Sequence, residues 1–165
     1  MARNWATVLS AGAALLAPAV VNAACLQQKA FYGDAAGAYE LSFEPIDSDA
    51  SASSHRIKVK ITHSKLVLDG YVMPSEPVNR TNGVLFNNCP EGDVTGADIA
   101  ACTVWEGIIY SSNAGRIDHL PPQGADAASE ILLAGFGPAL VQSSAWGPGK
   151  ATVAPWDVFS LKGCR

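Results

Sequence analysis

The most regular alternation of apolar and polar residues lies in residues 56–63. Three β-branched residues occupy every second position and three cations stand between them, namely Ile57, Val59, Ile61 and Arg56, Lys58, Lys60. A period of two is typical of a strand with one face in the core and the other in solvent. We expect the basic stripe to be a solvated sheet face, with an anion-facing surface as the alternative.

The same alternation, interrupted by turn signals, predicts further strands. They lie at residues 39–44, 103–110, 116–120 and 155–161. The pairs Asp69-Gly70 and Asn82-Gly83 each separate two apolar runs, which is the signal of a tight hairpin tip. Gly107 interrupts one of these strands and indicates a bulge or a close approach of two backbones.

A helical period occurs late in the chain, over residues 125–134. The apolar face of this helix would consist of Ala127, Ala128, Ile131 and Leu132. Gly135 would end it, and residues 138–144 predict one or two further helical turns. Six or so strands and one short helix near the C-terminus predict a mainly β fold, which is a small antiparallel β-sandwich or barrel.

The first residues of the chain have the three parts of a secretory signal peptide. A positive start precedes an apolar run over residues 7–21, and Val21 and Ala23 stand at positions −3 and −1 of a cut after Ala23. We therefore expect residues 1–23 to be a signal peptide and residues 24–165 to be a single exported β-rich domain. Its compartment would be the periplasm or the outside of the cell.

Four cysteines follow the predicted cut, at Cys25, Cys89, Cys102 and Cys164. Their spacing fits no metal motif, and an oxidising compartment favours two disulfides. We favour Cys89–Cys102, worth about 3 kcal/mol in the chain-entropy model, and Cys25–Cys164, worth about 5 kcal/mol. The alternative is Cys25–Cys89 with Cys102–Cys164. Lipidation of Cys25 is a minority alternative, because Asn22 stands where a lipoprotein signal has an aliphatic residue.

The charge of the chain argues against two classes of partner. Removal of residues 1–23 takes away one basic and no acidic residue, which leaves 10 basic and 15 acidic residues and a formal charge of −5. A mildly acidic domain without a large basic patch does not favour nucleic acid or an anionic lipid surface. After the leader, no apolar run is long enough for a transmembrane segment.

Sequence motifs for catalysis or cofactor binding are absent. The chain has no GxGxxG or P-loop for a nucleotide, no GxSxG or SxxK for a nucleophile, and no HExxH or similar metal spacing. We therefore expect no cofactor and no metal, and assign no catalytic residue. His63 continues the apolar face of its strand, and we expect it to be a satisfied histidine or a hairpin-end residue.

Glu106 is the one carboxylate that stands amid apolar residues, next to Trp105. If it were buried, its pKa would be raised, as a general acid requires. The alternative function is therefore a small envelope hydrolase that pairs Glu106 with Asp118, Asp157 or His119. A solvent-facing Glu on an edge strand is the simpler interpretation.

Our main hypothesis is a non-enzymatic binding module of the cell envelope, with an unknown envelope protein or glycan as partner. Trp146 lies in a Gly/Pro loop, where an aromatic is difficult to bury, so it is a possible partner contact, as are Trp105 and Glu106. Loops 89–102 and 145–150 would form the contact. We expect a monomer, and a purely structural role is the third hypothesis. In size, cysteines and compartment the chain is similar to small exported β-barrel modules such as bacterial lysozyme inhibitors, although it contains no motif of theirs.

Native mass spectrometry of the protein from its own exported fraction tests the leader and the cysteines together. We expect a bare monomer that begins at Ala24 and whose four cysteines are all oxidised. A mass that includes the leader, a lipid on Cys25 or free thiols would contradict these predictions. A retained metal or small molecule would instead support the hydrolase hypothesis.

Overall fold

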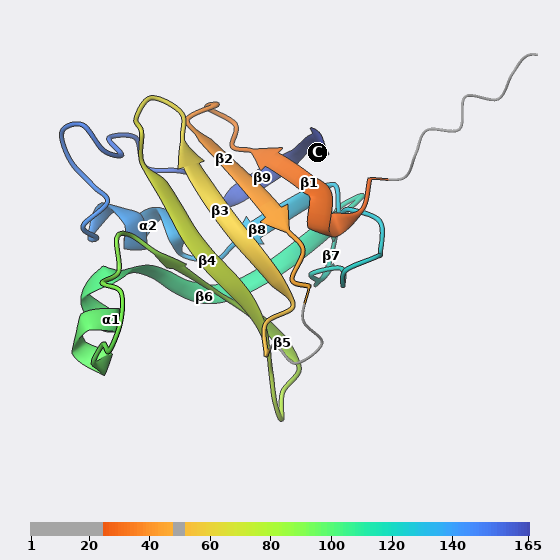
Figure 1. The fold of residues 1–165 in the computed structure, drawn as a ribbon. Helices are drawn as coiled ribbons and strands as arrows, with labels where there is room; N and C mark the ends of the chain where they lie inside the picture. The colour runs from red at the N-terminus through yellow and green to blue at the C-terminus, as the bar shows by residue number, and fades with distance from the viewer. Residues whose placement is uncertain (1–24, 48–51) are drawn as a thin grey trace, which may run out of the picture.

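The computed structural model describes residues 25–47 and 52–165, so the predicted signal peptide lies outside it. This part of the chain forms nine strands, two α-helices and one 3-10 helix, and Figure 1 shows how they are arranged. The strands are β1 (Ala30–Gly33), β2 (Tyr39–Glu44), β3 (His55–Ile61), β4 (Val67–Ser75), β5 (Arg80–Phe86), β6 (Thr103–Asn113), β7 (Arg116–His119), β8 (Glu130–Leu133) and β9 (Val158–Cys164). The helices are η1 (Gln27–Lys29), α1 (Gly96–Cys102) and α2 (Phe136–Val141).

Eight of these strands close into an antiparallel barrel. The order is β5-β4-β3-β2-β1-β9-β8-β6, and β5 pairs with β6 to complete the circle. β7 lies outside the circle and pairs with β6 alone. The predicted mainly β fold is confirmed, and the barrel rather than the sandwich is the architecture.

The β3 strand shows why the alternation forms a barrel wall. Ile57, Val59 and Ile61 are buried in the core, and the cations between them point outward. Two of these cations, Arg56 and Lys58, pair with carboxylates of the adjacent strands. Lys58 Nζ lies 2.7 Å from a Glu44 carboxylate oxygen on β2, and Arg56 lies 3.4 Å from Asp69 on β4. The outer face is therefore a solvated, charge-paired surface, as expected.

The first and last strands meet at a seam that is covalently closed. β1 pairs with β9, with Ala30 opposite Cys164. The Cys25–Cys164 disulfide joins the end of β9 to the segment before β1, and Cys89–Cys102 is the second bridge, so the favoured pairing is confirmed. Beyond the seam, the Arg165 guanidinium lies 4.9 Å above the Phe31 ring. The two disulfides indicate an oxidising, extracytoplasmic environment.

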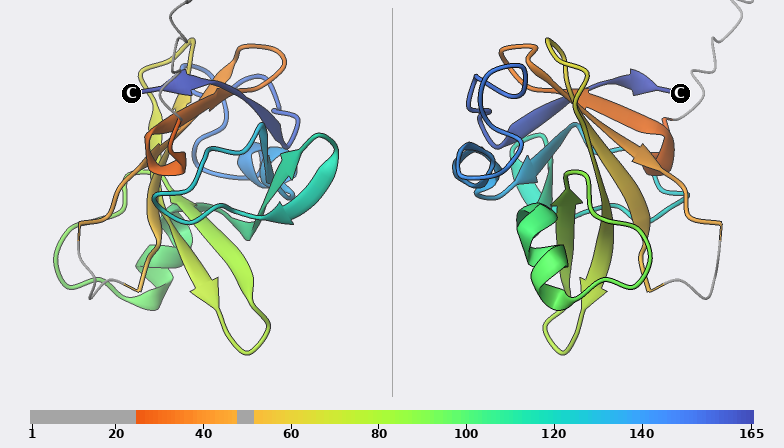
Figure 2. Two further views of the ribbon diagram at one scale, coloured as in Figure 1. Left: turned by 90° about the vertical axis from the view of Figure 1, so that its right-hand side faces the viewer. Right: turned by 60° about the vertical axis from the view of Figure 1, so that its left-hand side comes forward.

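Both predicted hairpin tips are wrong. Their glycines lie inside strands, where neighbouring atoms leave no space for a side chain. Asp69 and Gly70 lie within β4, which pairs along its length with β5, where Asn82 and Gly83 lie. A Cβ atom on Gly70 would stand 1.9 Å from the carbonyl oxygen of Val84. The β4–β5 turn lies instead at residues 76–79, at the tip of the hairpin that projects from the barrel in Figure 2.

The glycines of β5 and β6 make room for an indole. Gly83 stands opposite Gly107, and a Cβ atom on either would come within 2.8 Å of the Trp105 ring. The nearest atoms to a Cβ on Gly107 thus belong to a side chain, and the Ala134 carbonyl oxygen follows at 3.0 Å, so the predicted approach of a second backbone is only part of the reason for this glycine. The Trp105 Nε1–H donates to the carbonyl oxygen of Ala134 at 3.0 Å.

The predicted helix over residues 125–134 is wrong. Residues 130–133 form β8, in which Ile131 and Leu133 are buried by pairing with β6 and β9. Four apolar residues are too few for their period to distinguish a strand from a helix. Gly135, with φ 76°, precedes α2 rather than ending a helix. The short C-terminal helix therefore begins 11 residues and ends 7 residues later than expected, and it overlaps the turns predicted at 138–144.

α2 packs its apolar side into the barrel. Phe136 and Leu140 are fully buried, and the Phe136 ring lies 6.2 Å from the rings of Tyr39, Trp105 and Phe159. This aromatic cluster joins β2, β6 and β9 to the helix. Among the described residues, no helix has the length and apolarity to cross a membrane.

We expect Gly70→Ala to lower the free energy of unfolding by about 3 kcal/mol. The added methyl group would overlap the Val84 carbonyl oxygen of the adjacent strand β5. Urea denaturation of the oxidised protein measures this. Gly96→Ala is the matched control, because a Cβ there meets nothing within 4 Å, and it should leave stability almost unchanged. Equal stability of the two variants would contradict the close approach of β4 and β5 at Gly70.

Candidate functional site

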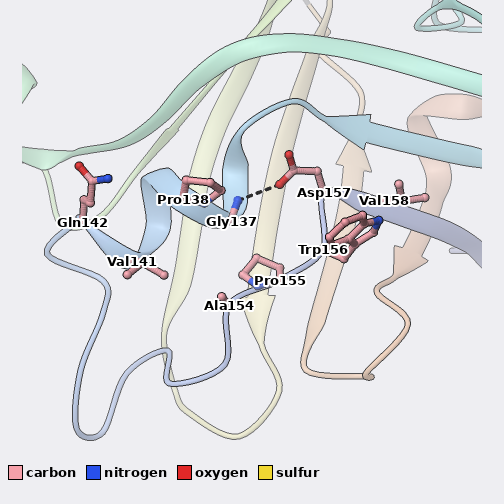
Figure 3. A pocket seen from close by; sticks show the side chains of 9 residues that line it. All are labelled: Gly137, Pro138, Val141, Gln142, Ala154, Pro155, Trp156, Asp157 and Val158. Carbon is pink, nitrogen blue, oxygen red and sulfur yellow. Dashed lines mark hydrogen bonds between the residues drawn. The ribbon is translucent and has the colours of Figure 1, made fainter.

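An apolar groove of about 750 Å³ lies beside α2 (Figure 3). One wall is the helix, and the other is the irregular segment that leads into β9. The lining residues are Gly137, Pro138, Val141, Gln142, Ala154, Pro155, Trp156, Asp157 and Val158. We call this pocket the α2 groove.

Trp156 is the most exposed large apolar side chain among the described residues, with 78% of its surface exposed. The residue before it, Pro155, is buried, and the hydroxyl of Tyr39 donates to the Val153 carbonyl oxygen a few positions earlier. The backbone of this segment is therefore anchored on the barrel while the indole projects. Exposed aromatic residues beside a concave apolar surface are typical of binding sites.

The carboxylate of Asp157 holds the two walls of the α2 groove together. Its oxygens accept hydrogen bonds from the backbone N–H of Gly135 at 2.6 Å and of Gly137 at 2.9 Å. Gly137 is needed here for another reason, because a Cβ atom would stand 2.4 Å from the carbonyl oxygen of Pro155. Close contact and charge-assisted hydrogen bonds thus fix the groove.

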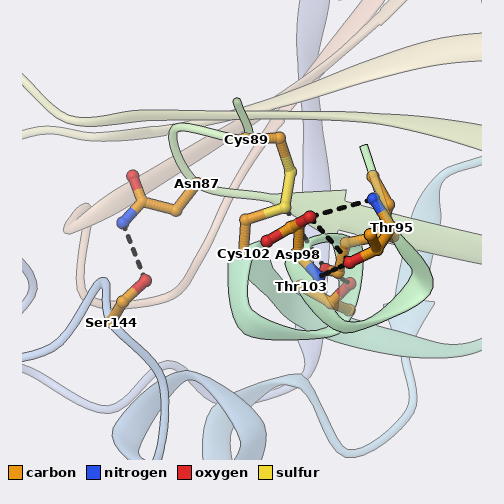
Figure 4. Close-up of a disulfide and its surroundings, with 8 residues drawn as sticks. Asn87, Cys89, Thr95, Asp98, Cys102, Thr103 and Ser144 are labelled. Atoms are coloured by element: carbon orange, nitrogen blue, oxygen red, sulfur yellow. Dashed lines mark hydrogen bonds between the residues drawn. A yellow bond between two sulfur atoms is a disulfide. The ribbon is translucent and has the colours of Figure 1, made fainter. Parts of the chain in front are cut away.

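A second pocket, of about 410 Å³, lies beside the loop that the Cys89–Cys102 disulfide closes (Figure 4). Its lining is mostly polar and consists of Asn87, Asn88, Pro90, Asp98, Ala101, Cys102, Ser144 and Lys150. We call it the stapled-loop cleft. It lies between the two loops, 89–102 and 145–150, that the sequence predicts as contact regions.

The stapled loop contains α1, a helix that the sequence analysis missed. Thr95 and Asp98 form a capping box, in which the Thr95 hydroxyl accepts from the Asp98 N–H and the Asp98 carboxylate accepts from the Thr95 N–H. Hydrogen bonds from the Thr95 side chain and backbone lower the pKa of Asp98. The sequence pattern that indicates this helix start is a threonine followed three positions later by an acidic residue.

The α2 groove and the stapled-loop cleft are neighbours. Gln142 lines the groove and Ser144 lines the cleft. Because these residues are two positions apart, their Cα atoms are separated by no more than about 7.6 Å. The views in Figures 1 and 2 show α1 and α2 on the same side of the barrel. One ligand of peptide length could therefore contact both surfaces.

Two of the predicted contact residues lie elsewhere than expected. Trp105 is only 2% exposed and belongs to the core, so it cannot be a surface contact in this structure. Trp146 is half-buried, packs against the core cluster and lines neither the groove nor the cleft. Its loop curls back, with Trp146 bridged to Ala151, which explains how a Gly/Pro segment can cover an aromatic ring.

Glu106 is exposed on the outer face of β6, so the buried carboxylate that the hydrolase hypothesis requires is not present. Asp118 pairs with Ser111, five positions along β6 from Glu106, or roughly 16 Å of strand. His119 pairs with Tyr110, four positions away, and Asp157 is bound to α2. The four candidate residues therefore do not come together.

Histidines and metal-ligating groups are also dispersed. His63 lies exposed in the β3–β4 turn, as one of the two expectations had it, and His119 is exposed on β7. His55 is buried beside Phe43, and burial lowers its pKa to about 4. Within residues 25–47 and 52–165, no group of three or more His, Cys, Asp or Glu side chains could hold a metal ion.

Comparisons with models of protein families, with curated proteins and with solved structures find no match for this chain.

The exposure of Trp156 differs from what its place in a predicted strand indicates. Trp156 looked like part of a closing strand, but β9 begins only at Val158, so Trp156 belongs to the loop before it. Pro155 directly before Trp156 was the available signal, because proline has no N–H for a strand ladder. Asn87 had no local signal, since its side chain donates a hydrogen bond to Ser144, 57 positions away.

We expect Asp157→Ala to lower the free energy of unfolding by about 2 kcal/mol, because two backbone N–H groups lose a charged acceptor. Amide hydrogen exchange at Gly135 and Gly137 should accelerate more than exchange in β3. Asp157→Asn, which keeps one acceptor oxygen, should have a smaller effect. Unchanged exchange at both glycines would show that the carboxylate does not hold the groove.

Proposed function

We propose that this protein is a non-enzymatic binding module of the cell envelope, and that the α2 groove receives an apolar segment of a partner protein. The observation that carries the proposal is the exposed Trp156 indole beside a preformed apolar pocket. An exposed tryptophan costs solubility without stabilising the barrel, and burial in a partner would supply the compensating free energy.

The walls of the groove favour a protein segment over a glycan. Glycans present many hydroxyl groups and need several free donors and acceptors in addition to an aromatic platform. Here the two carboxylate oxygens of Asp157 already accept backbone N–H groups, and Gln142 supplies the one remaining polar side chain of the lining. Apolar side chains of a peptide match the remaining lining.

The proposed place of action is outside the cytoplasm, in the periplasm or beyond the cell. The two disulfides support an oxidising environment, and the predicted signal peptide supplies the route of export.

We expect peptides selected from a random displayed library on the oxidised protein to lose about tenfold or more in affinity for Trp156→Ala, because truncation of a central aromatic contact typically has that effect. Isothermal titration calorimetry measures the affinity. Thermal unfolding of Trp156→Ala should match that of the parent protein, since the indole is mostly exposed.

Ile117→Ala is the matched control, since Ile117 is 53% exposed on β7 and does not line the groove. It should bind the selected peptides with parental affinity. Equal affinity of Trp156→Ala and the parent protein would refute the groove as the binding site. Binding of cell-wall oligosaccharides in competition with the peptides would instead assign the groove to a glycan.

A further inference from the structure

The stapled-loop cleft contains a buried polar group that nothing in the described structure pairs. Asn87 is only 7% exposed. Its Nδ2 group donates to the Ser144 hydroxyl at 3.1 Å, as Figure 4 shows, whereas its amide oxygen Oδ1 has no hydrogen-bond partner among the described residues. A buried acceptor without a donor is unfavourable, and native proteins retain few of them.

The charges around Asn87 select the kind of group that could pair with it. Asp98 and Lys150, which carry opposite charges, both line the cleft, so neither an anion nor a cation is favoured overall. One Lys150 N–H donates to the Ser144 carbonyl oxygen at 2.7 Å, and its other two donors can serve a ligand. A neutral group with an adjacent donor and acceptor fits this arrangement.

We propose that the stapled-loop cleft binds a neutral amide group, whose N–H donates to Asn87 Oδ1 and whose carbonyl oxygen accepts from Lys150. Because the cleft adjoins the α2 groove, the amide would belong to the main chain of the same partner segment whose apolar side chain enters the groove. This last step rests on the proposed function, but the amide site itself does not.

The neighbouring structure supports such a site. Asn87 is held from two directions, since its backbone N–H donates to the Cys102 carbonyl oxygen at 2.9 Å and its side chain contacts Ser144. The Cys89–Cys102 disulfide closes the adjoining loop, which limits its movement. The Asn87 amide oxygen has less than 1 Å² of accessible surface, so a ligand reaches it only when neighbouring side chains of the cleft move. Asn88 and Lys150 line the cleft and are exposed.

Two small amides test the proposal with the oxidised protein. N-methylacetamide has an N–H donor and a carbonyl acceptor, whereas N,N-dimethylacetamide has the acceptor alone. Titration of the ¹⁵N-labelled protein should shift the amide signals of Asn87, Ser144 and Lys150 with N-methylacetamide. The apparent affinity for N,N-dimethylacetamide should be about fivefold weaker, the factor lost with one neutral hydrogen bond. Equal responses to the two amides would overturn the proposal.

Variants separate this site from the α2 groove. Asn87→Leu should abolish the preference for N-methylacetamide, and Lys150→Met, at an exposed position, should weaken the response to both amides. Trp156→Ala should leave both responses unchanged, so failure of the peptide-binding experiment would not be confused with failure here. If Asn87→Leu does not fold, Lys150→Met and the comparison of the two amides still decide. A preference for N-methylacetamide that persists in folded Asn87→Leu would refute the role of the amide oxygen.

Discussion

Closure of the sheet is the constraint on which the rest of this structure depends. β1 and β9, at opposite ends of the described chain, form the last pair of a circle of eight strands, and the Cys25–Cys164 disulfide lies at their ends. An open sheet of this size would expose two edges that can pair with other chains. The barrel removes both edges and encloses the apolar faces that the alternation of the sequence provides.

Closure also explains the unusual packing of glycine. In a small barrel the strands coil strongly, and β4 and β5 approach so closely at Gly70 that no side chain fits. Gly83 and Gly107 leave the space that the Trp105 indole fills. Phe136 then completes the aromatic cluster, which fixes α2 against the barrel and so positions one wall of the candidate site.

The two surface pockets derive their rigidity from this frame. Asp157 links the segment before β9 to α2, and the second disulfide closes the loop before β6. Both devices hold irregular backbone in place, which reduces the conformational entropy that binding would otherwise cost. A preformed apolar groove next to a polar cleft is a suitable arrangement for an extended segment of another protein.

The sequence by itself determined the mainly β fold and the main core strands, because alternation is a local signal of burial. It favoured the observed disulfide pairing but left an alternative open, which the structure decided. It also indicated the two loops that line the stapled-loop cleft. Only the tertiary structure decided that Gly70 and Gly83 lie within strands, that residues 130–133 are a strand, and that Trp156 rather than Trp146 projects into solvent. These outcomes depend on which distant residues come to lie opposite each position, and closure of the barrel sets those neighbours.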